Sequence, residues 1–170
     1  MTIAVISDLH LGCGDPADRF GHADPDFLRF LRRLEGDFER IVLLGDVFET
    51  LTSRPRDGLD GLVAASRAHP AIARRIQGPG YLHVAGNHDL VTAETGAALD
   101  FVLHAGGLRI LFTHGHVLDW AVRNMRRLSE WATWLAATTL RRGLGPLYRV
   151  MSALDRSLTY GREGGDGEFR

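Results

Sequence analysis

The chain has 170 residues, of which 45% are hydrophobic, and a formal net charge of −1. This length and composition predict one globular domain with a sizeable core, and they exclude a disordered or collagen-like chain. The single cysteine, Cys13, excludes an internal disulfide framework and fits a reducing compartment. No apolar run is long enough to span a bilayer and no basic leader precedes the first strand, so we expect a cytoplasmic protein.

Three apolar runs in the first half of the chain each end in polar residues. The apolar runs predict buried strands over residues 3–6, 40–44 and 81–85. They lead, in order, into Asp8 and His10, into Gly45-Asp46-Val47-Phe48-Glu49, and into Gly86-Asn87-His88-Asp89. If strand geometry persists past the first run, Asp8 and His10 project to the same side and bind one ion. An Asp at a strand end is more often a turn residue or a helix cap, so one such ending alone is ambiguous.

Helical patterns separate these strands, over residues 24–36 and then over 59–66 and 72–76. Strands alternating with helical crossovers predict a parallel sheet with right-handed connections. The three polar clusters then meet at the carboxyl ends of the strands, where open α/β sheets bind ligands. We therefore predict an α/β fold with a metal site at this edge.

The second half of the chain begins with two β-like runs, 99–104 and 108–113, joined by Ala105-Gly106-Gly107. This pattern predicts a hairpin that presents His114 at the same edge. From residue 117 to 160 the pattern is that of two amphipathic helices. Arg123, Arg127 and Trp134 share one side of the first, which is either a face that rests on anionic lipid or the solvated face of a packed helix. The second interpretation is the simpler one.

Four motifs together resemble those of the calcineurin-like metallophosphoesterases. They are Asp8-x-His10, Gly45-Asp46, Gly86-Asn87-His88-Asp89 and Phe112-Thr113-His114-Gly115-His116, in this order over about residues 3–116. Three features resemble one branch of the family, which includes the UDP-2,3-diacylglucosamine diphosphatases. They are the segment 7–12, the Gly45–Glu49 motif and the spacing from His114 to Asp119. The resemblance implies a layered α/β sandwich, with ligands at the C-terminal ends of strands and a C-terminal helical segment.

The resemblance also implies roles for individual residues. Asp8 and His10 would bind a first divalent ion, Asp46 would bridge two ions, and Asn87 and His114 would bind the second. His88 would assist the leaving oxygen, and Asp89 would orient His88. Independently of the family, carboxylate, amide and imidazole ligands suit Mn²⁺, Fe or Zn²⁺ better than Ca²⁺, and we expect manganese first.

Other polar residues leave alternatives open. Glu49 either faces the substrate or caps the following helix, and His116 either reaches the site or is a solvated loop residue. His22, His69 and His104 have no motif context and are treated as ordinary histidines, and His83 as a packed or edge residue of its strand.

One family motif, a final Gly-His-x-His segment that supplies a ligand to each ion, has no counterpart in the sequence. Three explanations stay open: the chain is a piece of a longer enzyme, His116 replaces one ligand, or two-metal catalysis has been abandoned. The first is the one we favour, and it puts the full activity of this chain in doubt.

The sequence thus predicts a metal-dependent hydrolase of phosphodiester or diphosphate bonds, with a nucleotide-linked lipid favoured over nucleic acid as substrate. The alternative is a catalytically impaired scaffold that binds a protein or a membrane. We expect a metallophosphoesterase core over 1–116, an amphipathic helical insert or cap over 117–160, and a flexible tail over 161–170. Peripheral contact of 117–160 with the inner face of the membrane stays open as the alternative to a solvated arginine face.

Overall fold

The computed structural model describes residues 1–52, 58–118 and 120–160. Strands β1 (Ile3–Ile6), β2 (Arg40–Leu44) and β3 (Tyr81–Val84) form a parallel sheet in the order β1-β2-β3. Ile3 pairs with Arg40, and Ile41 pairs with Tyr81. The predicted parallel sheet is therefore confirmed, and its central strand β2 is buried over Ile41–Leu43 because both faces of the sheet are covered there.

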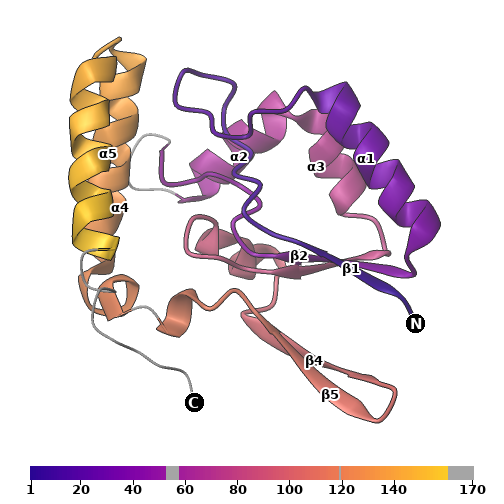
Figure 1. Ribbon diagram of the computed structural model, residues 1–170. Coiled ribbons are helices and arrows are strands. Elements are labelled where there is room, and N and C mark those ends of the chain that lie inside the picture. The colour runs from indigo at the N-terminus through magenta and orange to yellow at the C-terminus, as the bar shows by residue number, and fades with distance from the viewer. Residues whose placement is uncertain (53–57, 119, 161–170) are drawn as a thin grey trace.

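Helices α1 (Asp24–Asp37), α2 (Gly58–Ala68) and α3 (Pro70–Ile76) lie together over one face of this sheet (Figure 1). Phe27 and Leu31 recur at helical spacing on α1 and are buried, because that stripe faces the strands. The main core lies between these helices and the sheet. Its fully buried members include Leu11, Leu31, Ile41, Leu43, Ile72 and Ile76.

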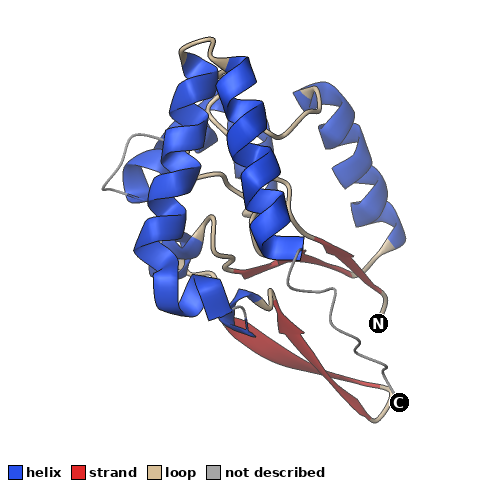
Figure 2. Ribbon diagram, turned by 60° about the vertical axis from the view of Figure 1, so that its left-hand side comes forward, coloured by secondary structure: helices blue, strands red, loops and turns tan. Residues whose placement is uncertain are grey.

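The predicted hairpin is also confirmed. Strands β4 (Asp100–Ala105) and β5 (Leu108–Thr113) pair antiparallel and form a separate two-stranded sheet (Figure 2). Its turn glycines, Gly106 and Gly107, both have positive φ, which residues with a side chain rarely adopt. The base of the hairpin packs against Val42 and Val84 on the second face of the parallel sheet through Phe112. A 3₁₀ helix (Leu90–Thr95) connects β3 to β4.

The C-terminal part is a helical pair. After a 3₁₀ turn (His116–Leu118), α4 (Trp120–Arg141) and α5 (Gly145–Tyr160) pack side by side (Figures 1 and 2). Arg141 connects α4 to the loop between β1 and α1 through an ion pair of 2.6 Å with Asp15. None of the helices in the described ranges is long and apolar enough to cross a membrane. The predicted tail over 161–170 lies outside the described residues, as does Asp119.

One histidine that the sequence analysis treated as ordinary has a defined structural position. His69 is buried between two carboxylates, with Nδ1 2.7 Å from Asp24 and Nε2 3.4 Å from Asp18. It therefore links the start of α3 to the segment between β1 and α1. We predicted that His83 is a packed or edge residue of its strand. Its Nε2 lies 2.7 Å from the carbonyl oxygen of Ile76, as expected for a packed residue.

Candidate metal centre

The polar residues after β1 and β2 lie in two adjoining loops that continue the pairing of the strands. The N–H groups of Asp8 and His10 donate to the carbonyls of Gly45 and Asp46, at 3.2 and 3.0 Å. Asp8, His10 and Asp46 have φ of 56°, 49° and 52°, in the left-handed region. The expectation that strand geometry persists to His10 is therefore wrong. Such strained backbone is typical of functional sites, and Asp and His tolerate it better than most residues.

Two glycines allow these loops to approach other parts of the site. A Cβ on Gly45 would lie 2.4 Å from the ring of His114, and Gly45 also has φ of +81°. A Cβ on Gly86 would lie 2.0 Å from Oδ1 of Asp46. Contacts this short do not occur between real side chains, so both positions require glycine. The Gly-Asp and Gly-Asn motifs are thus explained by close packing at the strand ends.

Asp46 lies at the centre of the polar cluster. Its side chain is almost fully buried, its Oδ1 accepts from the His88 N–H at 2.8 Å, and its Oδ2 is 3.3 Å from Nε2 of His114. Potential ligand atoms lie within 4.8 Å of one another in two groups, His10-Asp46-His88 and Asp8-Asp46-His114. Asp46 belongs to both groups, which is the position that a bridging ligand requires.

The grouping differs from the predicted ligand sets in two respects. Asp8 and His10, which we expected to share an ion, fall into different groups. His88, expected to be catalytic, falls into a group with His10 and Asp46. The assignment of ligands to individual ions stays a prediction.

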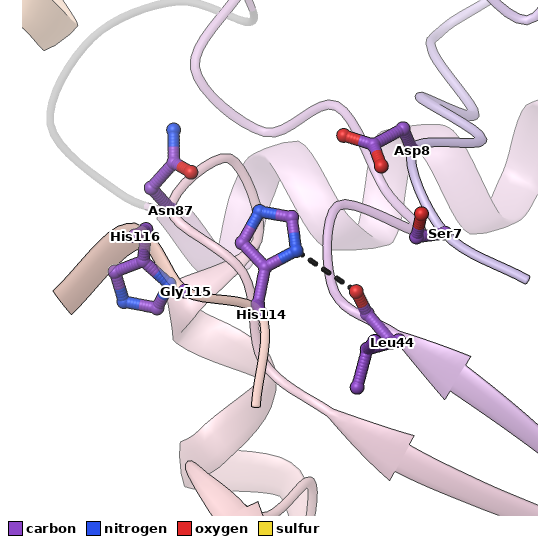
Figure 3. A pocket seen from close by; sticks show the side chains of 7 residues that line it. All are labelled: Ser7, Asp8, Leu44, Asn87, His114, Gly115 and His116. Atoms are coloured by element: carbon purple, nitrogen blue, oxygen red, sulfur yellow. Dashed lines mark hydrogen bonds between the residues drawn. The ribbon is translucent and has the colours of Figure 1, made fainter. Parts of the chain in front are cut away.

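His114 is delivered by the end of β5, as predicted. Its Nδ1 lies 2.8 Å from the Leu44 carbonyl and donates to it (Figure 3). This bond leaves Nε2 facing Asp46, 3.3 Å from Oδ2. Histidines that bind metals are commonly held in this way, with the other ring nitrogen bonded to a carbonyl oxygen. Hydrogen bonding to Asp46 outweighs burial and raises the pKa of His114 to about 9, so at neutral pH a proton balances the carboxylate unless a cation replaces it.

A pocket of about 440 Å³ opens beside this pair. Asp8 and Ser7 line it on one side of His114, and Asn87 and His116 line it on the other (Figure 3). The predicted ligand Asn87 is therefore at the site. His116 is half-buried, with its ring centroid 5.5 Å from that of His114, so it reaches the site and is not a solvated loop residue.

Glu49 is the second residue, after His116, whose role the sequence left open. It is fully buried, so it does not face the substrate, and its Oε1 accepts from the Leu51 N–H at 3.1 Å. Its Oε2 accepts from Nδ1 of both His10 and His88, at 3.2 and 2.8 Å, and the two rings meet edge to face. Burial alone would raise the pKa of Glu49, but these hydrogen bonds lower it to about 2. One feature of the sequence could have indicated this role: Glu49 is acidic, whereas the two residues between it and Asp46 are apolar.

Asp89 has a different role from the predicted one. Its carboxylate is 1% exposed and accepts from the backbone N–H groups of Gly86 (2.7 Å), Val47 (2.8 Å), Phe48 (3.1 Å) and Asp46 (3.2 Å). The prediction that Asp89 orients His88 is therefore wrong, because Glu49 bonds to that ring. Asp89 instead fastens the loop after β3 to the loop after β2. Its burial, which outweighs the hydrogen bonds, raises its pKa.

The donor chemistry fits a divalent metal. The cluster combines a buried carboxylate with imidazole nitrogens, a second carboxylate from Asp8 and an amide from Asn87, which are ligands of Mn²⁺, Fe and Zn²⁺. Of these groups Asp46 is the buried one, and a buried carboxylate is costly unless a cation or a proton donor partners it.

Comparison with known proteins gives the family. The model of the calcineurin-like phosphoesterase superfamily domain matches residues 1–137. The chain belongs to this superfamily. A conserved uncharacterized protein of Streptococcus pneumoniae TIGR4, titled a predicted phosphoesterase, is similar with 23% identity and a TM-score of 0.36. The similarity covers 77% of this chain and 54% of that structure, so the chain spans about half its length. No curated protein matches.

Substitution of Gly86 by alanine tests the close packing at Asp46. The added methyl group displaces the Asp46 carboxylate, so we expect at least a tenfold loss of Mn²⁺ affinity and a loss of stability of about 1–3 kcal/mol. Calorimetric titration with Mn²⁺ and thermal unfolding measure the two effects. Gly80→Ala is the matched control, since a Cβ there meets nothing within 4 Å. Equal affinity in both variants would contradict the packing argument.

Substitution of Asp89 by asparagine tests the link between the loops. The amide group replaces one acceptor oxygen with a donor, which leaves buried N–H groups without a partner at about 1–3 kcal/mol each. We expect the free energy of unfolding in urea to fall by about 3 kcal/mol. Asp100→Asn, on an exposed carboxylate of β4, should change it by less than about 0.5 kcal/mol. If Asp89→Asn also changed the free energy of unfolding by less than about 0.5 kcal/mol, the hydrogen bonds of Asp89 would not hold the two loops together.

Proposed function

We propose that this calcineurin-like phosphoesterase is a metal-dependent hydrolase of phosphodiester or diphosphate bonds that uses two divalent cations, with Mn²⁺ the first expectation. The observation that carries the proposal is the presence of Asp46 in both groups of ligand atoms. A pair of divalent ions bound there would activate a water molecule and stabilise negative charge on the attacking and leaving oxygens.

The chain's own residues hold this arrangement in advance. Asp46 is fixed by the His88 N–H, and Asp89 fixes the loop that carries Asp46. The Leu44 carbonyl fixes the ring of His114. Glu49 holds Nδ1 of His10 and of His88, so Nε2 is the nitrogen that each ring offers to a cation or to substrate. For His88 we propose that Nε2 donates to the leaving oxygen.

The helical pair supports an amphiphilic substrate. Leu128 and Trp131 on α4 and Leu147 and Val150 on α5 are largely exposed, and so are neighbouring arginines. These arginines are Arg127, Arg142 and Arg149. Exposed apolar groups among arginines favour a lipid with an anionic headgroup. We therefore propose a nucleotide-linked lipid such as UDP-2,3-diacylglucosamine as substrate, met at the inner face of the cytoplasmic membrane.

Hydrolysis assays test the activity. In the presence of Mn²⁺ we expect turnover of bis(p-nitrophenyl) phosphate and of UDP-2,3-diacylglucosamine, with loss of both on chelation of the metal. Asp46→Asn should lower kcat by at least about a hundredfold because both ions lose a ligand, whereas Asp100→Asn should leave it unchanged. Activity that survives Asp46→Asn would refute the proposal. Metal uptake by the wild-type protein without hydrolysis of either ester would favour the non-catalytic scaffold.

The role of His88 has a separate test. If Nε2 protonates the leaving oxygen, His88→Ala should lower kcat by about 10²–10⁴-fold for an alkyl ester, whose leaving group needs a proton. The effect should be much smaller for a p-nitrophenyl ester, because that leaving group departs as an anion. Metal content, measured by elemental analysis, should stay at the wild-type value. Loss of one ion in the variant would make His88 a ligand instead.

A further inference from the structure

The pocket beside His114 has two walls of different chemistry. The carboxylate of Asp8 lies on one side of the His114 ring, and Asn87 and His116 lie on the other (Figure 3). Asp8 and His114 form, together with Asp46, one of the two groups of potential ligand atoms. A cation in that group would therefore border the pocket, and a phosphate bound to the cation would lie between the two walls.

The turn after β5 sets the position of His116. Gly115 has φ of +83°, a conformation that favours glycine, and its carbonyl accepts from the Leu118 N–H at 2.9 Å as the 3₁₀ turn begins. The Nδ1 atom of His116 is buried, and the ring centroid lies 5.5 Å from that of His114. Because the residue is only half-buried and lines the pocket, Nε2 is the ring nitrogen that can meet a ligand there.

His116 lines the pocket without belonging to either group of potential ligand atoms. In the part of the chain that the structure describes, the side chains of these groups are Asp8, His10, Asp46, His88 and His114. This arrangement favours contact with bound substrate over the alternative in which His116 replaces a missing metal ligand. An imidazole N–H donates to anionic oxygens, and a hydrogen bond to a charged group is about twice as strong as one between neutral groups.

We propose that His116 binds the substrate, with Nε2 donating a hydrogen bond to a non-bridging oxygen of the phosphate group at the metal centre. This inference rests on the proposed function. The carboxylate of Asp8 on the opposite wall repels phosphate oxygens that no cation holds, so these oxygens face the His116 side. A non-bridging oxygen is negatively charged before and during the reaction. The contact therefore strengthens binding of substrate and transition state alike, and it acts on KM more than on kcat.

Two variants of similar size separate this hydrogen bond from packing. His116→Gln keeps an N–H donor, whereas His116→Leu fills the space without one. In calorimetric titrations of the Mn²⁺-loaded proteins with inorganic phosphate, we expect about tenfold weaker binding by His116→Leu and binding within about threefold of wild type by His116→Gln. For bis(p-nitrophenyl) phosphate, KM of His116→Leu should rise by about the same factor, with kcat within about twofold of wild type. His104→Leu, at an exposed histidine of β4, is the control and should change neither quantity.

Metal content and phosphate binding separate this inference from the proposed function. Elemental analysis of His116→Leu should give the wild-type manganese content, and loss of an ion would make His116 a metal ligand and overturn the inference. If the wild-type protein hydrolyses no ester, the proposed function fails, but the phosphate titrations still test His116. Equal phosphate affinity in the wild-type protein and His116→Leu would overturn the role of His116. Equal losses in His116→Leu and His116→Gln would show a packing role and would also overturn it.

Discussion

The site depends on one buried carboxylate that joins two loops. Asp89 accepts backbone N–H groups from the loop after β2 and from the loop after β3, and it is almost completely excluded from water. Neighbouring parallel strands do not by themselves fix the conformation of the loops that leave them. A shared acceptor for their N–H groups does, because each N–H would otherwise be buried without a partner.

A second buried carboxylate, that of Glu49, fixes the rings of His10 and His88. Glu49 lies beneath His10 and His88 and bonds to Nδ1 of both rings. Both acidic residues are therefore supports for the groups that would meet metal and substrate. This division of roles explains why a cluster with many ionisable side chains keeps a single geometry, and why glycine is required where Gly45 and Gly86 let His114 and Asp46 approach.

Helix α4 is connected at both of its ends to segments that carry site residues or adjoin them. α4 begins shortly after His114, and Arg141 at its end returns to the loop that carries Asp15. The C-terminal end of α4 and the loop between β1 and α1 are therefore held together. In the proposed reaction a phosphate would lie at the strand ends, and the rest of the proposed amphiphilic substrate would lie towards the helices.

The sheet, the hairpin and the residues of the cluster could be predicted from the sequence, because apolar periodicity and strand-end motifs are local properties. The sequence placed Asp8, His10, Asp46, Asn87 and His114 at one edge, and the structure brings them together there. Which carboxylate bonds to His88 could not be predicted in this way, since Glu49 and Asp89 are both acidic residues of the strand-end motifs; the folded structure shows that it is Glu49. Their roles follow from burial and from the direction of each side chain. These depend on contacts between residues about forty positions apart, and on left-handed backbone that no periodic pattern reveals.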